Sequence, residues 1–179
     1  MSIKYSENGN TAIITLNRPN NLNALNYEMI ISIEECLKNI NKNKNIKLVI
    51  FKGEGDKAFC AGGDVKSFYE ENLTNINKLR KIFFYREYKL NYLIKKYKKP
   101  IISFVNGICM GGGVGIAMHS SIVIVSENVK FAMPECTIGL FPDVGSSNFL
   151  SKLKSNIGLY IALTGKRLVS GDLIELGLA

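Results

Sequence analysis

The sequence predicts an α/β domain with a layered core and mainly parallel strands. Short runs rich in branched apolar residues alternate with longer segments of helical periodicity, and turn-forming or glycine-rich clusters separate them. Strands that are separated by helices pair in parallel through crossover connections. The chain has 179 residues and no linker or shift in composition, so we expect one domain spanning residues 1–179.

The expected elements follow one another along the chain. The expected strands are residues 11–16, 47–51, 58–60, 101–105, 122–125 and 129–132. The expected helices are residues 25–40, 76–99, 114–119, 146–153 and 159–163, with one more beginning near Asp64. The carboxylate of Asp64 suits a helix N-cap. Pro100 ends the helix expected at residues 76–99.

Two glycine-containing loops each follow a strand. One runs from Ala61 to Gly63, and the other includes Gly111 and Gly112 at the start of a helix. Because glycine has no Cβ, the backbone can approach a ligand closely and its N–H groups can converge on one point. We expect each loop to give one N–H to a single oxygen, forming an oxyanion hole. The alternative is that both loops only allow close packing of strand and helix.

Two carboxylates lie in loops rather than on helix faces. Glu135 follows Pro134 among apolar residues, where burial raises a carboxyl pKa and suits it to acid–base work near neutral pH. Asp143 lies in a second apolar turn. The alternatives are a salt-bridged loop residue for Glu135 and a turn or N-cap residue for Asp143. The single histidine, His119, is expected to be packed or hydrogen-bonded rather than catalytic.

Composition narrows the classes of function. The four cysteines are widely spaced without a Cys-x-x-Cys motif, which predicts a reducing intracellular compartment and neither a metal site nor a disulfide framework. No apolar run approaches the roughly 20 residues that cross a bilayer, and no targeting segment is visible before residue 11. The formal charge of +8 favours a polyanionic partner, unless the Lys/Asn-rich stretches are simply solvated.

Four motifs in order and spacing carry a resemblance. Residues 59–64 (FCAGGD), 110–113 (MGGG), 133–135 (MPE) and 141–145 (FPDVG) resemble the crotonase (enoyl-CoA hydratase/isomerase) superfamily from residue 11 to residue 179. The sequence of residues 131–145 resembles the 3-hydroxyisobutyryl-CoA hydrolase branch of this superfamily. The resemblance implies a crotonase-like spiral of repeated β-β-α units, with the C-terminal helical part missing from a truncated core domain.

The resemblance also implies site roles. The backbone N–H groups of Ala61 and Gly112 would hold the thioester oxygen, Glu135 would attack the carbonyl carbon or activate water, and Asp143 would orient substrate or water and manage the proton. Substrate contacts are implied for Ala24, Leu25, Gly62, Asp64, Glu87 and Gly111. The implied partner is an acyl-CoA, with CoA part of the substrate and no separate cofactor. A homo-oligomer and a mitochondrial or cytoplasmic location are compatible with the resemblance.

The expected reaction is the hydrolysis of 3-hydroxyisobutyryl-CoA in valine catabolism, and three alternatives stand beside it. Family hydratases carry a catalytic glutamate where this chain has Gly115, so hydration or isomerisation of an enoyl-CoA is less favoured. Some crotonase relatives bind RNA, but the chain has no interleaved aromatic and basic residues of the kind that stack bases, so we do not expect nucleic acid as a partner. A catalytically silent scaffold is the third alternative.

Overall fold

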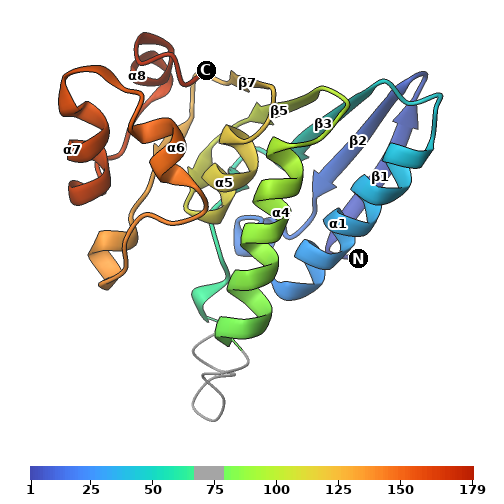
Figure 1. The fold of residues 1–179 in the computed structure, drawn as a ribbon, viewed down its shortest axis with the longest axis horizontal. Helices are drawn as coiled ribbons and strands as arrows, with labels where there is room; N and C mark the ends of the chain where they lie inside the picture. Colours follow the sequence, from blue (N-terminus) through green and yellow to red (C-terminus); the bar gives the residue numbers. More distant parts are fainter. Residues whose placement is uncertain (67–78) are drawn as a thin grey trace.

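The strands form two sheets within the part of the chain that the computed structural model describes, residues 1–66 and 79–179 (Figure 1). The five-stranded sheet has the order β1 (Ile3–Asn8), β2 (Thr11–Leu16), β3 (Leu48–Gly53), β5 (Ile101–Val105), β7 (Ile122–Val125). The three-stranded sheet has the order β4 (Ala58–Cys60), β6 (Ile108–Met110), β8 (Lys130–Ala132). Only β1 and β2 pair antiparallel in these sheets, which confirms the predicted parallel architecture.

Helices cover one face of the larger sheet. The α-helices are α1 (Tyr27–Lys42), α4 (Tyr85–Lys95), α5 (Gly112–Met118), α6 (Ser146–Leu150), α7 (Ile157–Thr164) and α8 (Ser170–Glu175). The other helical turns are η1 (Pro19–Asn21), the π-helical η2 (Leu79–Phe84), η3 (Glu135–Ile138) and η4 (Lys154–Asn156). In Figure 1, α1, α4 and α5 lie next to one another in front of the sheet, and α6, α7 and α8 gather beyond α5.

The core lies between the larger sheet and these helices. The apolar side of α1, including Met29, Ile33 and Leu37, is fully buried, as are Ile14 and Phe51 of the sheet. Burying a side chain of this size contributes about 1.5–3 kcal/mol. The helix begins where the Asn26 side chain accepts a hydrogen bond from the Met29 N–H, so capping and hydrophobic patterning act together.

Most of the predicted elements are confirmed. The strands predicted at 11–16, 58–60, 101–105 and 122–125 have those bounds, and the other two predicted strands are shifted at their ends by one or two residues. The helix predicted at 76–99 is a π-helical turn followed by α4, which ends at Lys95. Residues 76–78, and most of the helix predicted from Asp64 onward, lie outside the described residues.

Six short elements were not predicted, namely β1, β6, η1, η3, η4 and α8. The first of these, β1, is an edge strand whose residues after Ile3 are exposed, so it lacks the alternating apolar pattern of a half-buried strand. The next, β6, has three residues between Gly107 and Gly111. Such short segments depend on their neighbours rather than on local sequence.

Candidate functional site

A pocket of about 390 Å³ opens where the two glycine loops meet α4 and the segment after β8. Glycine-loop backbone and three carboxyl-bearing side chains, Glu87, Glu135 and Asp143, form one part of its wall. The rest is largely apolar, with Val65, Phe83, Phe84, Pro134, Ile138 and Leu140. A concave apolar site with a few convergent polar groups is the usual form of a small-molecule site.

The first glycine loop is held by pairing with the segment that precedes α1. The Leu25 N–H donates to the Gly62 carbonyl at 2.7 Å, and the Asp64 N–H donates to the Leu25 carbonyl at 2.8 Å. Both groups therefore face Leu25. Gly63 lies between Gly62 and Asp64 and forms a parallel bridge with Leu25, so its own N–H points away from Leu25. Gly63 lines the pocket on that side. Among the described residues this N–H has no hydrogen-bond partner.

The Ala61 amide does not take the role that the sequence analysis gave it. Its N–H donates to the Leu22 carbonyl at 3.0 Å, so it is engaged in holding the two segments together. The assignment of this N–H as an oxyanion donor is therefore wrong for this conformation. In a regular strand the amides of residues two apart face the same side. Gly62, with a φ of +106°, interrupts the extended backbone between Ala61 and Gly63, so the Gly63 amide faces the pocket while the Ala61 amide is bonded to Leu22.

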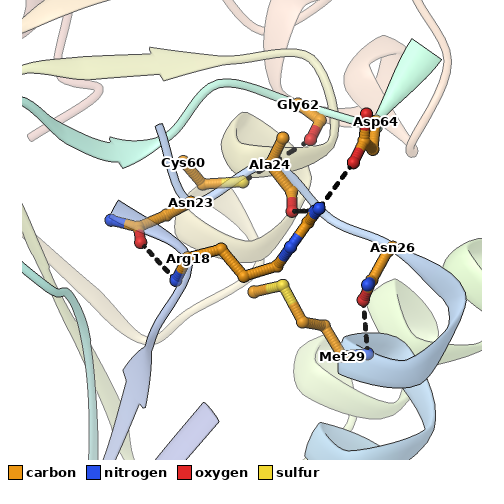
Figure 2. Close-up of polar contacts among 8 residues, drawn as sticks. All are labelled: Arg18, Asn23, Ala24, Asn26, Met29, Cys60, Gly62 and Asp64. Atoms are coloured by element: carbon orange, nitrogen blue, oxygen red, sulfur yellow. Dashed lines mark hydrogen bonds and ion pairs between the residues drawn. The ribbon is translucent and has the colours of Figure 1, made fainter. Parts of the chain in front are cut away.

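An ion pair between Arg18 and Asp64 also holds the first glycine loop (Figure 2). The Arg18 guanidinium donates to the Ala24 carbonyl and to Asp64 Oδ2, both at 2.7 Å. The side chain of Asn23, fully buried, accepts from the Arg18 N–H and donates to the Ala58 carbonyl at 2.8 Å. A partly buried charge pair, with the guanidinium also bonded to a backbone carbonyl, favours one geometry over others.

The second glycine loop starts α5. Gly111 has a φ of +48°, which favours glycine, and its N–H donates to the Ala132 carbonyl at 3.2 Å. The next N–H, that of Gly112, opens the helix and has no partner among the described residues. A Cβ added to Gly62 would lie 3.6 Å from the Gly112 nitrogen, so the two loops are in contact. Two unpartnered amides, of Gly63 and Gly112, thus belong to adjoining backbone segments of one pocket.

Two of the three carboxyl groups, those of Glu135 and Glu87, lie close against the second glycine loop. A Cβ on Gly111 would lie 2.9 Å from Glu135 Oε1, and one on Gly112 would overlap Glu87 Oε1. Burial raises the pKa of Glu87 to about 8, and the carboxylates of Asp143 and Glu135 add to that rise. Burial also raises the pKa of Glu135 to about 7, which confirms the expectation from its apolar surroundings. Glu135 Oε2 is buried and has no hydrogen-bond partner among the described residues.

Asp143 is positioned from two helices. The Tyr88 hydroxyl of α4 donates to Asp143 Oδ2 at 2.7 Å. Burial raises the pKa of Asp143, while the hydrogen bond from Tyr88 opposes that rise. The next carbonyl, that of Val144, lies 2.8 Å from His119 Nε2 of the turn after α5. His119 is buried, so the expectation of a packed, hydrogen-bonded histidine is confirmed.

The structure brings together most of the residues singled out by sequence, but not all. Ala61, Gly62, Gly111, Gly112, Glu87, Glu135 and Asp143 line the pocket. Ala24, Leu25 and Asp64 do not line it, because they are buried behind the first loop, where they hold its backbone. Sequence analysis missed Gly63, Arg18 and Tyr88. For Gly63 a signal was available, since it sits in the same glycine loop.

The position that Gly115 occupies has no room for a side chain. A Cβ there would lie 2.7 Å from Val144 Cβ and 2.9 Å from Asn91 Oδ1. Distances under about 3 Å force neighbouring atoms to move. Val144 and Asn91 therefore fill the space in which a side chain on this turn of α5 would stand.

The fold and the site together define a crotonase-type domain, a spiral of parallel strands and helices in which two glycine loops and several carboxyls share one pocket. The chain belongs to the enoyl-CoA hydratase/isomerase family, whose model matches residues 11–179.

The chain is 46% identical to the mitochondrial 3-hydroxyisobutyryl-CoA hydrolase of Danio rerio, over 99% of this chain and 46% of that protein. It is 45% identical to the probable 3-hydroxyisobutyryl-CoA hydrolase 3 of Arabidopsis thaliana, over 99% of this chain and 47% of that protein. The chain thus spans about half the length of the curated relatives it matches.

Solved structures agree with this fold. An enoyl-CoA hydratase from Rhodobacter sphaeroides has a TM-score of 0.95 at 37% identity, covering 100% of this chain and 53% of that one. A carnitinyl-CoA dehydratase from Mycobacterium thermoresistibile has a TM-score of 0.94 at 36% identity, covering 99% of this chain and 52% of that one. Among the described residues, no helix is both long and apolar enough to span a bilayer.

The buried carboxyls predict a pH dependence of stability. Glu87 has a pKa of about 8 in the folded chain against an ordinary 4.5, so above pH 4.5 the folded state binds more protons than the unfolded state. The free energy of unfolding should therefore fall as pH rises from about 5 to about 9. Glu87→Gln should make that fall shallower in urea titrations, while Glu28→Gln, on an exposed part of α1, should not. If the free energy of unfolding falls equally steeply with pH in the parent and both variants, the raised pKa of Glu87 is contradicted.

The filled space beside Gly115 predicts a second effect. Gly115→Ala should lower the free energy of unfolding by about 1–3 kcal/mol, because the new methyl group collides with Val144 and Asn91. Gly171→Ala in α8 is the matched control, since a Cβ there meets nothing within 4 Å, and it should leave stability unchanged or slightly raised. Urea denaturation followed by circular dichroism measures both; equal effects would refute the packing argument.

Proposed function

We propose that this chain carries the catalytic site of an acyl-CoA thioester hydrolase, with 3-hydroxyisobutyryl-CoA as its substrate. Curated relatives with 45–46% identity bear the name of that hydrolase, while the solved hydratase and dehydratase neighbours are 36–37% identical. The observation that carries the proposal is the meeting of two unpartnered amides with the buried Glu135 in one pocket. A mitochondrial location belongs to the same proposal, supported by the name of the Danio rerio relative.

Stabilisation of the oxyanion is assigned to the backbone. The N–H groups of Gly63 and Gly112 would donate to the thioester oxygen as negative charge develops on it. A preorganised donor of this kind lowers the barrier by about 3–4 kcal/mol. Both amides are held by structure that exists before substrate binds, Gly63 by the bridge to Leu25 and Gly112 by the start of α5.

Glu135 would supply the nucleophilic chemistry. As a general base, its carboxylate takes a proton from water while the water oxygen attacks the thioester carbon. As a nucleophile, the carboxylate attacks the carbon itself and forms a mixed anhydride, which water then cleaves to release the acid and restore the Glu135 carboxylate. In either route the C–S bond breaks and the CoA sulfur leaves with the bonding electrons and accepts a proton. With a pKa of about 7, Glu135 is substantially ionised at neutral pH and still basic enough to accept a proton.

The carboxyl groups of Glu87 and Asp143 would bind and orient the substrate. Glu87, with a pKa of about 8, is mostly protonated at neutral pH and can donate a hydrogen bond to the hydroxyacyl group. Asp143 would orient the substrate or water and relay the proton. Keeping one carboxyl neutral limits the repulsion among three acids in a single apolar pocket.

The alternative reaction within the family, hydration of an enoyl-CoA, is disfavoured by one specific feature. The position at which hydratases carry a first catalytic glutamate is Gly115 here, and Val144 and Asn91 occupy the space beside it. The site therefore keeps Glu135 but has no carboxyl group at the position of the first glutamate in the two-glutamate mechanism.

Replacing the central carboxylate tests the proposal. Glu135→Gln should lower the rate of thiol release from 3-hydroxyisobutyryl-CoA by about 100-fold or more, because an amide can neither accept the proton nor attack carbon. Binding of the CoA ester, followed by titration calorimetry, should be largely retained. Glu127→Gln, on an exposed loop, is the control and should keep the parent rate. Near-parent turnover of Glu135→Gln, or hydration of crotonyl-CoA without thiol release by the parent, would refute the hydrolase.

A further inference from the structure

The Asp143 carboxyl has an unusual set of donors. Its Oδ2 receives the Tyr88 hydroxyl at 2.7 Å, and its own backbone N–H also stabilises the charged form. Among the described residues no cation pairs with it. The tyrosine hydroxyl is therefore the side-chain group that fixes where this carboxyl points within the pocket.

Tyr88 is placed for this contact by α4. It directly follows Glu87, so neighbouring positions of α4 supply one side chain that lines the pocket and one that bonds the Asp143 carboxyl. The phenol ring packs near Phe84, with ring centroids 6.0 Å apart, and 41% of the side chain is exposed. Phe84 itself lines the pocket. The ring thus has an aromatic neighbour on one side, which restricts its motion and reduces the entropy lost in making the hydrogen bond.

The segment that bears Asp143 needs support. Val144 has a φ of +45°, a conformation that branched side chains rarely adopt. His119 Nε2 lies 2.8 Å from the Val144 carbonyl, and a Cβ on Gly145 would lie 2.7 Å from the same nitrogen. The backbone after Asp143 is therefore held by the turn at the end of α5. With the backbone held there, the remaining freedom is that of the carboxyl side chain, which Tyr88 restrains.

We infer that Tyr88 is a positioning residue for the hydrolysis, acting through Asp143: its hydroxyl holds the Asp143 carboxylate in the orientation that directs substrate or water toward Glu135. This inference rests on the proposed function. The charged or titratable groups that face the contact are Glu87 of α4 and Glu135 of η3, both acidic. Without the Tyr88 donor, repulsion from the ionised Glu135 would turn the Asp143 carboxylate away from it, toward solvent.

Removing one oxygen atom tests the inference. Tyr88→Phe keeps the ring and its packing but loses the donor, so kcat for thiol release from 3-hydroxyisobutyryl-CoA should fall about tenfold, the worth of one hydrogen bond to a charged group, with KM changed much less. Tyr88→4-aminophenylalanine restores a neutral donor at the same place and should recover most of that loss. Tyr92→Phe, one turn along α4 and 67% exposed, is the matched control and should keep the parent kcat.

A double variant separates positioning from folding. If Tyr88 acts through Asp143, then Tyr88→Phe combined with Asp143→Asn should be no slower than Asp143→Asn alone. Two results would overturn the role of Tyr88 and leave the proposed function standing. In the first, the parent chain hydrolyses the thioester and Tyr88→Phe is equally fast. In the second, Tyr88→Phe causes a further tenfold loss of kcat in the Asp143→Asn background. A parent chain that releases no thiol would overturn the proposed function, and this inference with it.

Discussion

The site depends on the contact between two backbone segments that carry no side chains where they meet. Gly62 approaches the second glycine loop so closely that a Cβ on it would lie 3.2 Å from the Met110 carbonyl oxygen and 3.6 Å from the Gly112 nitrogen. This approach brings amides of the two loops into one pocket, and each loop is fixed by long-range hydrogen bonds, to Leu25 and Ala132. The strands β4 and β6, which lead into the loops, are paired in the smaller sheet, so the fold sets the separation of the loops.

The chemistry of the pocket follows from placing three acids in apolar surroundings. Burial raises the pKa of all three carboxyls, to about 8 for Glu87 and about 7 for Glu135. Groups with such values can hold or accept a proton near neutral pH, which ordinary surface carboxylates cannot do. The apolar wall around them therefore raises the pKa values of the acids, and under the proposed function it would also contact the acyl group.

The sequence alone predicts the architecture and most of the site because both are carried by local signals. Branched apolar runs mark β2, β5 and β7, and glycine or proline marks the loops that bear Gly112, Glu135 and Asp143. The Ala61 assignment failed because the direction of an amide in a loop depends on its pairing partner, here the Leu22 carbonyl, which is far away in the sequence. Arg18 and Tyr88 were missed for the same reason, since their partners, Asp64 and Asp143, are 46 and 55 residues away.

The most direct test of the central claim is a crystal structure of the Glu135→Gln variant with 3-hydroxyisobutyryl-CoA bound. The account predicts that the thioester oxygen lies about 3 Å from both the Gly63 and Gly112 nitrogens, with the side chain at position 135 facing the thioester carbon. A thioester oxygen that contacts neither nitrogen, or a Gly63 amide turned out of the pocket, would contradict it.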